Sequence, residues 1–374
     1  MKKVGIITIQ KPPENYGASL QAYALWRYVD NLGFDCEIID LLRPWHPLYK
    51  LTSKDASYKK SIKQRLIRLL VGKKLGYKML NSSRYREFDR FNSICKYSKC
   101  YRSIDELYKD VPLYDYYISG SDQIWNPNMN IENEPYFLTF APLGAQKISY
   151  ASSFAIQSLP EDISMKFGGW LKSYHSISVR EETGVKIINN MKIGKNAEVV
   201  LDPTFLLTKN DWIELFEGIG DKKNYIFVYL LHSNDYIYKY IGEISRKMGL
   251  KVYLVISDTS AQVPNSFETL MDIGPIHWIE YIKNAQFVIT DSFHCTVFSL
   301  LFERRFQTII SNKMVSSRLQ NLLLKLGASD CLINVDDFDK DYDIFPKLDY
   351  EIINKSIEKE RNKSIVFLNK ALNL

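Results

Sequence analysis

The residues best suited to catalysis stand together in the segment FVITDSFHCTVFSLL, residues 287–301. The apolar run Phe287–Thr290 predicts a strand, and the apolar run after His294 predicts a helix. The turn between the two runs carries a carboxylate, a hydroxyl and an imidazole, from Asp291, Ser292 and His294. Such a turn lies at the carboxyl edge of a parallel sheet, where the N–H groups of the first helical turn attract an anion. We therefore predict Asp291 or Ser292 as the helix cap, and His294 as an acid/base group beside a phosphate or carboxylate.

A loop near the start of the chain carries groups that suit a hydroxyl-rich ligand. A predicted strand ends in QKPPENYG, residues 10–17, and a predicted helix follows. Asn15 and Tyr16 in the loop and Gln21 in the helix are neutral hydrogen-bonding groups, which pair well with sugar hydroxyls. We interpret these three side chains as candidate binding residues.

A second loop, SGSDQIWN at residues 119–126, also follows a predicted strand. Its carboxylate Asp122, amide Gln123 and indole Trp125 resemble a sugar-binding set, with the indole as a stacking platform. The alternative is that Trp125 only fills the edge of its domain.

A third loop, SVRE at residues 178–181, presents an arginine at the end of a predicted strand. Arg180 could offer its fork to a carboxylate or phosphate. It could equally form an ion pair with Glu181 or Glu182. We interpret the other histidines as structural residues, namely His46, His175, His232 and His277.

Strand and helix patterns alternate along almost the whole chain, which predicts a parallel α/β sheet in each of two domains. We place a Rossmann-like domain at residues 1–205, with a basic helical insertion at 54–102. A second such domain covers residues 206–349, and a closing helix covers 350–374. Two halves of this kind favour an enzyme whose site lies in a central cleft between them.

Positive charge is concentrated in the insertion. Residues 54–102 contain fifteen Lys and Arg against three Asp and Glu, although the whole chain has a net charge of only +6. This segment could be a solvated helix covering one side of a domain. It could also dock on an anionic membrane surface or contact a pyrophosphate-bearing acceptor. No nucleic-acid recognition motif accompanies the charge, so we expect no nucleic-acid partner.

Several classes of protein are excluded by what the sequence lacks. It has no dinucleotide-binding GxGxxG motif, no P-loop and no G-x-S-x-G elbow. Its five cysteines are scattered, and no His and carboxylate cluster has metal-ligand spacing, so we expect no metal. We find neither a signal peptide nor an apolar stretch of membrane-spanning length, and we therefore expect a cytoplasmic location.

Taken in order, these loops resemble the motifs of the polysaccharide pyruvyl transferase family. The resemblance extends over residues 4–330. The groups that carry it are Asn15-Tyr16-Gly17-Ala18 with Leu20-Gln21-Ala22-Tyr23-Ala24, Gly120-Ser121-Asp122-Gln123-Ile124-Trp125, Ser178-Val179-Arg180-Glu181, Leu201-Asp202-Pro203-Thr204, residues 285–294, and Ser316-Ser317-Arg318-Leu319.

The resemblance implies a fold like that of the two-domain B-type glycosyltransferases. It implies transfer of the enolpyruvyl-derived group of phosphoenolpyruvate (PEP) onto two hydroxyls of a sugar, as a cyclic ketal, with release of phosphate. PEP would be a co-substrate, and no metal or organic cofactor is required. The acceptor would be a glycan or lipid-linked oligosaccharide precursor of a surface polysaccharide, reached at the inner face of the membrane.

The resemblance also suggests roles for the residues already named. His294 would be the general acid/base, and Arg180, Ser292 and Arg318 would bind the donor, with the second domain as the donor side. The acceptor-side residues of the first domain would be Asn15, Tyr16, Gln21, Asp122, Gln123 and Trp125.

Two departures from the family pattern bear on these roles. Many members have an arginine two residues before the histidine, where this chain has Ser292, so Arg318 would have to supply that charge. Many have glycine after the histidine, whereas Cys295 could crowd the donor phosphate or point into the helix–sheet interface. A nucleotide-sugar glycosyltransferase of the same architecture, or a non-catalytic glycan-binding member, remain alternatives.

Overall fold

The chain folds into two compact units. The computed structural model describes residues 1–11, 15–44, 46–52, 82–129, 133–219, 223–256, 262–310, 313–338 and 346–374. The first unit contains Met1–Leu206 and Arg361–Leu374, and the second unit contains Leu207–Glu360. The sequence placed the boundary after residue 205 and treated 350–374 as a separate closing helix. In the structure, helix α12 (Tyr350–Ala371) contributes its first half to the second unit and its second half to the first.

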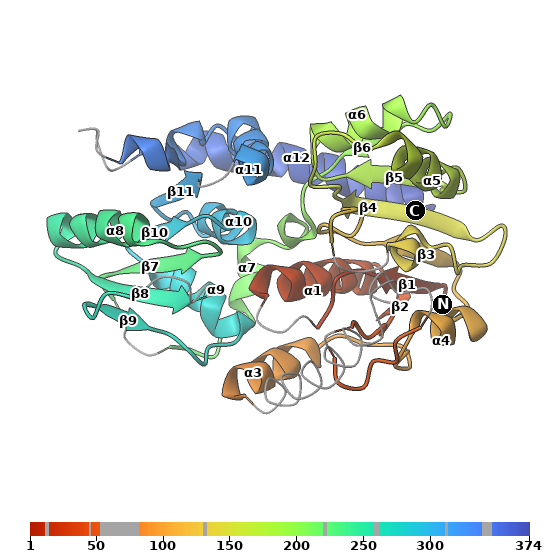
Figure 1. Ribbon diagram of the computed structural model, residues 1–374, viewed down its shortest axis with the longest axis horizontal. Coiled ribbons are helices and arrows are strands. Elements are labelled where there is room, and N and C mark those ends of the chain that lie inside the picture. Colours follow the sequence, from red (N-terminus) through yellow and green to blue (C-terminus); the bar gives the residue numbers. More distant parts are fainter. Residues whose placement is uncertain are drawn as a thin grey trace, which may run out of the picture. The chain divides into compact units, whose positions relative to one another are not determined.

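The described part of the first unit has a six-stranded parallel sheet in the order β2-β1-β3-β4-β5-β6 (Figure 1). Its strands are β1 (Lys3–Ile7), β2 (Asp35–Ile38), β3 (Tyr116–Ser119), β4 (Gln146–Ser152), β5 (Ser176–Val179) and β6 (Ala197–Val199). Its helices are α1 (Tyr16–Asn31), α3 (Ser83–Asn92), α4 (Ile104–Lys109), α5 (Glu161–Leu171) and α6 (Glu182–Asn190). One core cluster of aliphatic and aromatic side chains, including Ile7, Ile177 and Phe167, packs within this unit.

The described part of the second unit repeats this architecture, with a parallel sheet in the order β12-β11-β10-β7-β8-β9. Its strands are β7 (Tyr225–Leu230), β8 (Lys251–Ile256), β9 (Phe267–Thr269), β10 (Phe287–Thr290), β11 (Phe306–Ile310) and β12 (Leu332–Asn334). Its helices, besides the first half of α12, are α7 (Lys209–Ile213), α8 (Asp235–Met248), α9 (Pro275–Asn284), α10 (Phe293–Leu301) and α11 (Lys313–Leu326). Single 3-10 turns occur in the two units at Glu134–Phe137, Pro203–Phe205, Ser329–Cys331 and Val335–Asp337.

Local sequence explains where the site-bearing elements begin and end. Strands β7 and β10 consist mainly of apolar residues and are buried along their length, as expected of central strands covered on both faces. Helix α8 begins after Asn234, whose side chain accepts a hydrogen bond from the Ile237 N–H. It ends at Gly249, whose φ of 65° is a left-handed cap that glycine adopts without strain.

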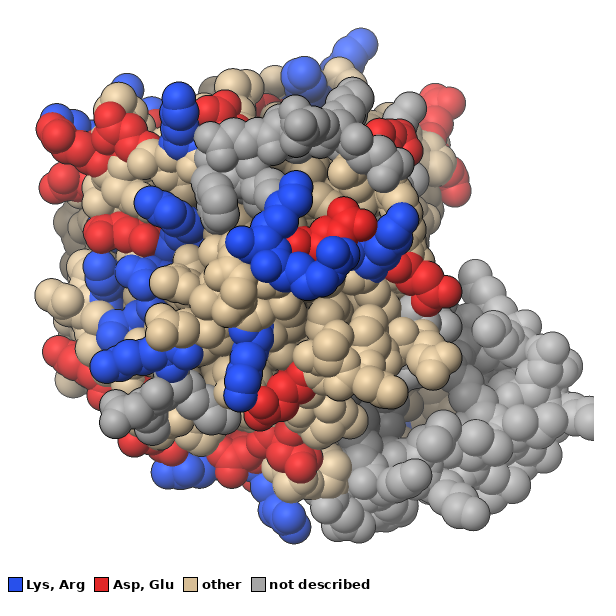
Figure 2. Space-filling view, turned by 90° about the vertical axis from the view of Figure 1, so that its left-hand side faces the viewer, with Lys and Arg blue, Asp and Glu red and all other residues tan. Residues whose placement is uncertain are grey.

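The structure confirms the predicted fold class, α/β with two Rossmann-like sheets. The predicted basic helical insertion cannot be compared with the structure over residues 53–81, which hold most of its positive charge, because they lie outside the described residues. On the face drawn in Figure 2, Lys and Arg side chains lie next to Asp and Glu side chains, so basic and acidic groups are mixed there. Because residues 53–81 are not described, docking of the insertion on a membrane stays a prediction.

Candidate functional site

The carboxyl ends of β7 and β10 form the centre of the candidate site in the second unit. These two strands are neighbours in the sheet, and the chain proceeds from them toward opposite sheet edges. In open α/β sheets, ligands bind at such a topological switch point. His232 follows β7, while Asp291, Ser292 and His294 follow β10. The turn that the sequence singled out thus lies where this fold binds ligands.

Asp291 joins the two strand ends. Its Oδ1 accepts a hydrogen bond from the Leu231 N–H at 2.6 Å, and its Oδ2 accepts one from the His232 N–H at 3.0 Å. Oδ2 also lies 3.2 Å from Nδ1 of the His232 ring. The Asp291 side chain is only 4% exposed, whereas the His232 side chain is 61% exposed. The result is an accessible imidazole oriented by a buried carboxylate.

Ser292, and not Asp291, caps helix α10. The Ser292 side chain accepts a hydrogen bond from the Cys295 N–H at 3.5 Å, and its own N–H donates to Thr290 Oγ1 at 3.0 Å. The Cys295 side chain is fully buried, and burial raises the pKa of its thiol. Of the two positions predicted for Cys295, the structure therefore favours the helix–sheet interface.

The two other donor-side candidates of the second unit lie in consecutive helices. His294 is in the first turn of α10, with its ring centroid 5.3 Å from that of Phe293, and it is 8% exposed. Arg318 is in the second turn of α11 and is 9% exposed. Helix α11 follows β11, which pairs with β10, so both helices begin at the same edge of the sheet.

The first unit has its own switch point, between β1 and β3. Here Thr8 Oγ1 donates a hydrogen bond to the Ser121 carbonyl at 3.0 Å. A Cβ on Gly120 would lie 2.8 Å from Thr8 Cβ, so only glycine allows the two strand ends to approach this closely. The loops at residues 10–17 and 119–126, which the sequence assigned to a hydroxyl-rich ligand, both leave this edge.

Three of the six predicted acceptor-side residues keep some access to this edge. Asn15 is exposed and caps α1, accepting a hydrogen bond from the Ala18 N–H at 3.1 Å. Gln123 is half-buried, and its Oε1 accepts a hydrogen bond from Asn126 Nδ2 at 2.9 Å. Asp122 is 8% exposed and adopts a left-handed φ of 73°, a strained conformation for a residue other than glycine.

Trp125 is a core residue rather than a stacking platform. Its side chain is fully buried and stacks on Phe137, with ring centroids 5.0 Å apart. Its Nε1 donates a hydrogen bond to the Tyr136 carbonyl at 3.2 Å. Since both faces and the N–H of the indole are covered, the structure supports the alternative in which Trp125 fills the domain edge.

Tyr16 and Gln21 are also fully buried and cannot contact a sugar from the surface. The Tyr16 ring packs on Phe88 with centroids 4.9 Å apart. Gln21 Nε2 donates to Thr8 Oγ1 at 3.0 Å and to the Ile9 carbonyl at 3.1 Å, which fixes α1 against the end of β1. Both residues were predicted to bind the acceptor, and their burial argues against that role.

Arg180 lies among carboxylates of the first unit. Its Nη1 donates to Asp202 Oδ2 at 2.9 Å, while Asp122 Oδ1 lies 3.6 Å from Nη2 and Glu181 Oε2 lies 3.9 Å from Nε. Its side chain is 2% exposed. Burial alone would lower the pKa of the guanidinium, but Asp202, Asp122 and Glu181 outweigh it and raise that pKa. This geometry favours the ion-pair alternative, with Asp202 as the nearest partner.

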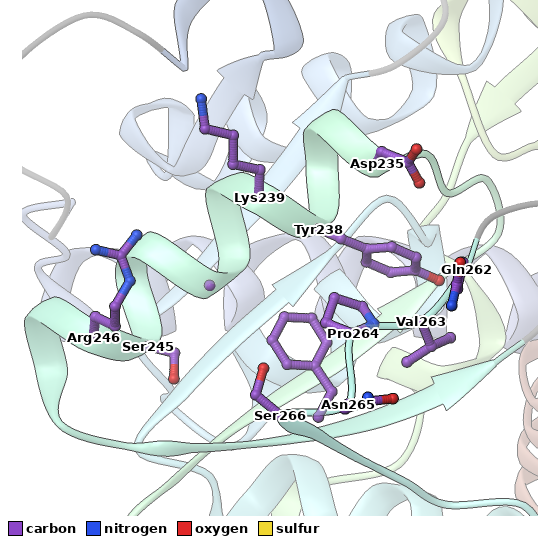
Figure 3. Close-up of a pocket in the computed structure, with 12 residues that line it drawn as sticks. Asp235, Tyr238, Lys239, Ser245, Arg246, Gln262, Val263, Pro264, Asn265 and Ser266 are labelled. Carbon is purple, nitrogen blue, oxygen red and sulfur yellow. The ribbon is translucent and has the colours of Figure 1, made fainter.

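A separate pocket of about 650 Å³ lies between α8 and the segment of residues 262–267. Tyr238 and Ser245 point from the helix toward that segment, whereas the charged ends of Lys239 and Arg246 point away from it (Figure 3). None of the strand-end residues described above lines this pocket. We therefore do not assign it to the candidate site.

The sequence analysis interpreted His232 as structural, because a lone histidine most often is, and the structure places it beside Asp291 at the strand ends of the candidate site. The available signal was its position directly after a predicted strand. Within the described residues, no group of three or more His, Cys, Asp or Glu side chains could hold a metal ion. The described helices include none that is long and apolar enough to cross a membrane.

Solved structures with a similar fold include enzymes that act on nucleotide sugars. A UDP-GlcNAc 2-epimerase from Methanocaldococcus jannaschii is 13% identical, with 96% of this chain and 93% of that chain covered and a TM-score of 0.51. The UDP-GlcNAc 2-epimerase from Neisseria meningitidis is 9% identical (99% and 94% covered, TM-score 0.47). Arabidopsis thaliana UGT89C1 is 12% identical (99% and 94% covered, TM-score 0.48). A comparison with curated proteins gave no match.

The fold is that of a two-unit, Rossmann-like α/β protein, and it is shared with the UDP-GlcNAc 2-epimerase from Methanocaldococcus jannaschii. The family of polysaccharide pyruvyl transferases matches residues 15–313, which is most of the chain. The protein belongs to the polysaccharide pyruvyl transferase family, as the sequence motifs predicted. Membership in this family implies that it is an enzyme.

Proposed function

We propose that this protein transfers the enolpyruvyl-derived group of PEP onto two hydroxyls of a sugar and so forms a cyclic pyruvate ketal. The acceptor in this proposal is a lipid-linked precursor of a surface polysaccharide. The observation that carries the proposal is the Asp291–Ser292–His294 turn at the switch point of a sheet in a chain of this family. An imidazole beside a capped helix N-terminus suits a donor that carries both a phosphate and a carboxylate.

In the proposed reaction, His294 protonates the methylene carbon of PEP while a sugar hydroxyl attacks the adjacent carbon. The Ser292 hydroxyl, the first amides of α10 and the Arg318 guanidinium hold the donor anions. Phosphate then leaves, and a second hydroxyl closes the ring. Asn15, Asp122 and Gln123 are the acceptor-side residues of this proposal, because their side chains retain some exposure. Arg180 remains a donor-side candidate only if PEP can compete with Asp202.

The decisive experiment offers the purified protein PEP together with galactoside or mannosaminide acceptors and measures phosphate release and product mass. We expect the acceptor to gain one pyruvate less one water. His294→Asn should lower kcat by roughly 10²–10⁴-fold, the usual contribution of a general acid or base. Arg318→Ala should weaken PEP binding by about 10–100-fold, as expected for a lost charged hydrogen bond.

The control is His175→Asn. His175 is exposed and comes directly before β5 of the first unit, at the amino end of a strand, whereas the candidate site lies at the carboxyl ends of strands. It should leave kcat unchanged. Sugar transfer from a nucleotide donor without any response to PEP would refute the proposal in favour of a glycosyltransferase. Full activity of His294→Asn would refute the role of this histidine even if the substrates were correct.

A further inference from the structure

We propose that His232 is a second acid/base residue of the same site, positioned by Asp291, and that it accepts the proton of the attacking sugar hydroxyl. This inference rests on the proposed pyruvyl transfer. It deepens that proposal by dividing the proton transfers between two histidines from neighbouring strands.

The position of His232 is fixed by the sheet. Strands β7 and β10 pair in parallel with Thr290 opposite Tyr229, so the residues after both strands emerge at the same edge. The backbone N–H groups of Leu231 and His232 both donate to the Asp291 carboxylate. The chain after β7 is therefore held against the turn that carries His294, three residues beyond Asp291.

The orientation of the His232 ring suits a proton acceptor. Asp291 Oδ2 lies 3.2 Å from Nδ1, and a carboxylate there favours a proton on Nδ1 and leaves Nε2 to exchange one with a ligand. The carboxylate is buried while the imidazole is 61% exposed. By contrast, His277 Nε2 lies 3.9 Å from Glu217 Oε2, which is too long for a hydrogen bond.

The chemistry requires an acid and a base at the same moment. As the first C–O bond forms, the acceptor hydroxyl loses its proton and the methylene carbon of PEP gains one to become a methyl group. When the second hydroxyl closes the ring, the bond to phosphate breaks and the second hydroxyl proton leaves with the phosphate. The addition and the ring closure involve no net oxidation or reduction, so no oxidant or reductant is needed. A single imidazole cannot donate and accept in one step, whereas His294 and His232 together can.

The test uses His232→Asn, because an asparagine amide can still donate to Asp291 in place of Nδ1 but cannot accept a proton. We expect kcat for pyruvyl transfer to fall about 100-fold or more while the Kd for PEP stays unchanged. Added imidazole should restore part of the rate in His232→Gly, since the site of this side chain is open to solvent. Asp291→Asn should lower kcat without changing the KM for PEP.

The outcomes separate this inference from the proposed function. If the wild-type protein forms no pyruvylated product, the proposed function fails. If it forms the product and His232→Asn retains the wild-type kcat, only the role of His232 fails. If His232→Asn weakens PEP binding but leaves kcat unchanged, the acid/base role also fails, because His232 would then only contact an anionic group of PEP. Independently of turnover, PEP should shift the ring NMR signals of His232 but not those of His175, and unshifted His232 signals would contradict the inference.

Discussion

Burial decides what a single side chain in this protein can do. Trp125 and His232 differ most clearly in this respect, since the indole is fully buried and the imidazole is 61% exposed. The Trp125 indole N–H donates to the Tyr136 carbonyl, and the His232 ring lies beside Asp291, but only the His232 ring is also accessible to a ligand. At the residue scale, the type of a residue alone therefore does not show whether its side chain packs in the core or faces solvent.

The core role of Trp125 leads to a prediction about stability. Trp125→Ala should lower the free energy of unfolding by about 3–5 kcal/mol, because it removes a large buried ring packed on Phe137. Urea unfolding followed by circular dichroism would measure this. Leu143→Ala is the control, since Leu143 is fully exposed and its truncation should change stability little. An equally small effect of both substitutions would contradict the core assignment.

At the element scale, the carboxyl ends of β3 to β6 share one buried polar network. Arg180 after β5 contacts Asp202 after β6 and Asp122 after β3, and Ser121 Oγ also donates to Asp202 at 3.0 Å. Ser153 Oγ, after β4, donates to Glu181 at 2.7 Å. One guanidinium thus compensates several carboxylates that belong to different strands, and it fixes the loops that leave this edge.

We therefore expect Arg180→Ala to act on stability before it acts on any ligand. Removing the guanidinium leaves buried carboxylates without compensation, which typically costs about 3–5 kcal/mol. Arg27→Ala is the matched control, because Arg27 pairs with Asp30 at 3.8 Å on the surface and such pairs contribute at most about 1 kcal/mol. Denaturant midpoints of the two variants give the comparison. A stable Arg180→Ala protein with weakened PEP binding would instead favour the donor-clamp role.

At the scale of the whole molecule, the first unit is completed by the end of the chain. The Ser364 hydroxyl accepts a hydrogen bond from the Leu201 N–H at 2.9 Å, and Arg361 Nε donates to the Phe205 carbonyl at 2.5 Å. Both contacts join the second half of α12 to the segment after β6. The first unit is therefore built from two stretches of chain that are far apart in the sequence.

This arrangement predicts that the end of the chain stabilises the first unit. Ser364→Ala should lower the free energy of unfolding by about 1–3 kcal/mol, because it leaves the buried Leu201 N–H without its acceptor. Asn362→Ala, at an exposed position of the same helix, is the control. Hydrogen exchange should localise the loss, with faster exchange at Leu201 in the Ser364 variant. Unchanged exchange there would contradict the proposed contact.

The sequence by itself determined the features that depend on neighbouring residues. Alternating apolar runs specified two parallel α/β sheets, and the strand-to-helix turn at residues 291–294 was recognisable because its strand, cap and helix are contiguous. The ordered loops were enough to identify the family. Local patterns of this kind require no knowledge of what packs against them.

Only the tertiary structure decided the contacts between residues distant in the chain. His232 and Asp291 are 59 residues apart, and sheet pairing alone makes them a pair. The burial of Trp125 and the compensation of Arg180 by Asp202, 22 residues further on, likewise depend on how strands and helices stack. A polar or aromatic residue at the end of a strand can be either exposed or buried in the core. Which of the two occurs depends on the strands and helices that pack around it, and therefore on the tertiary structure.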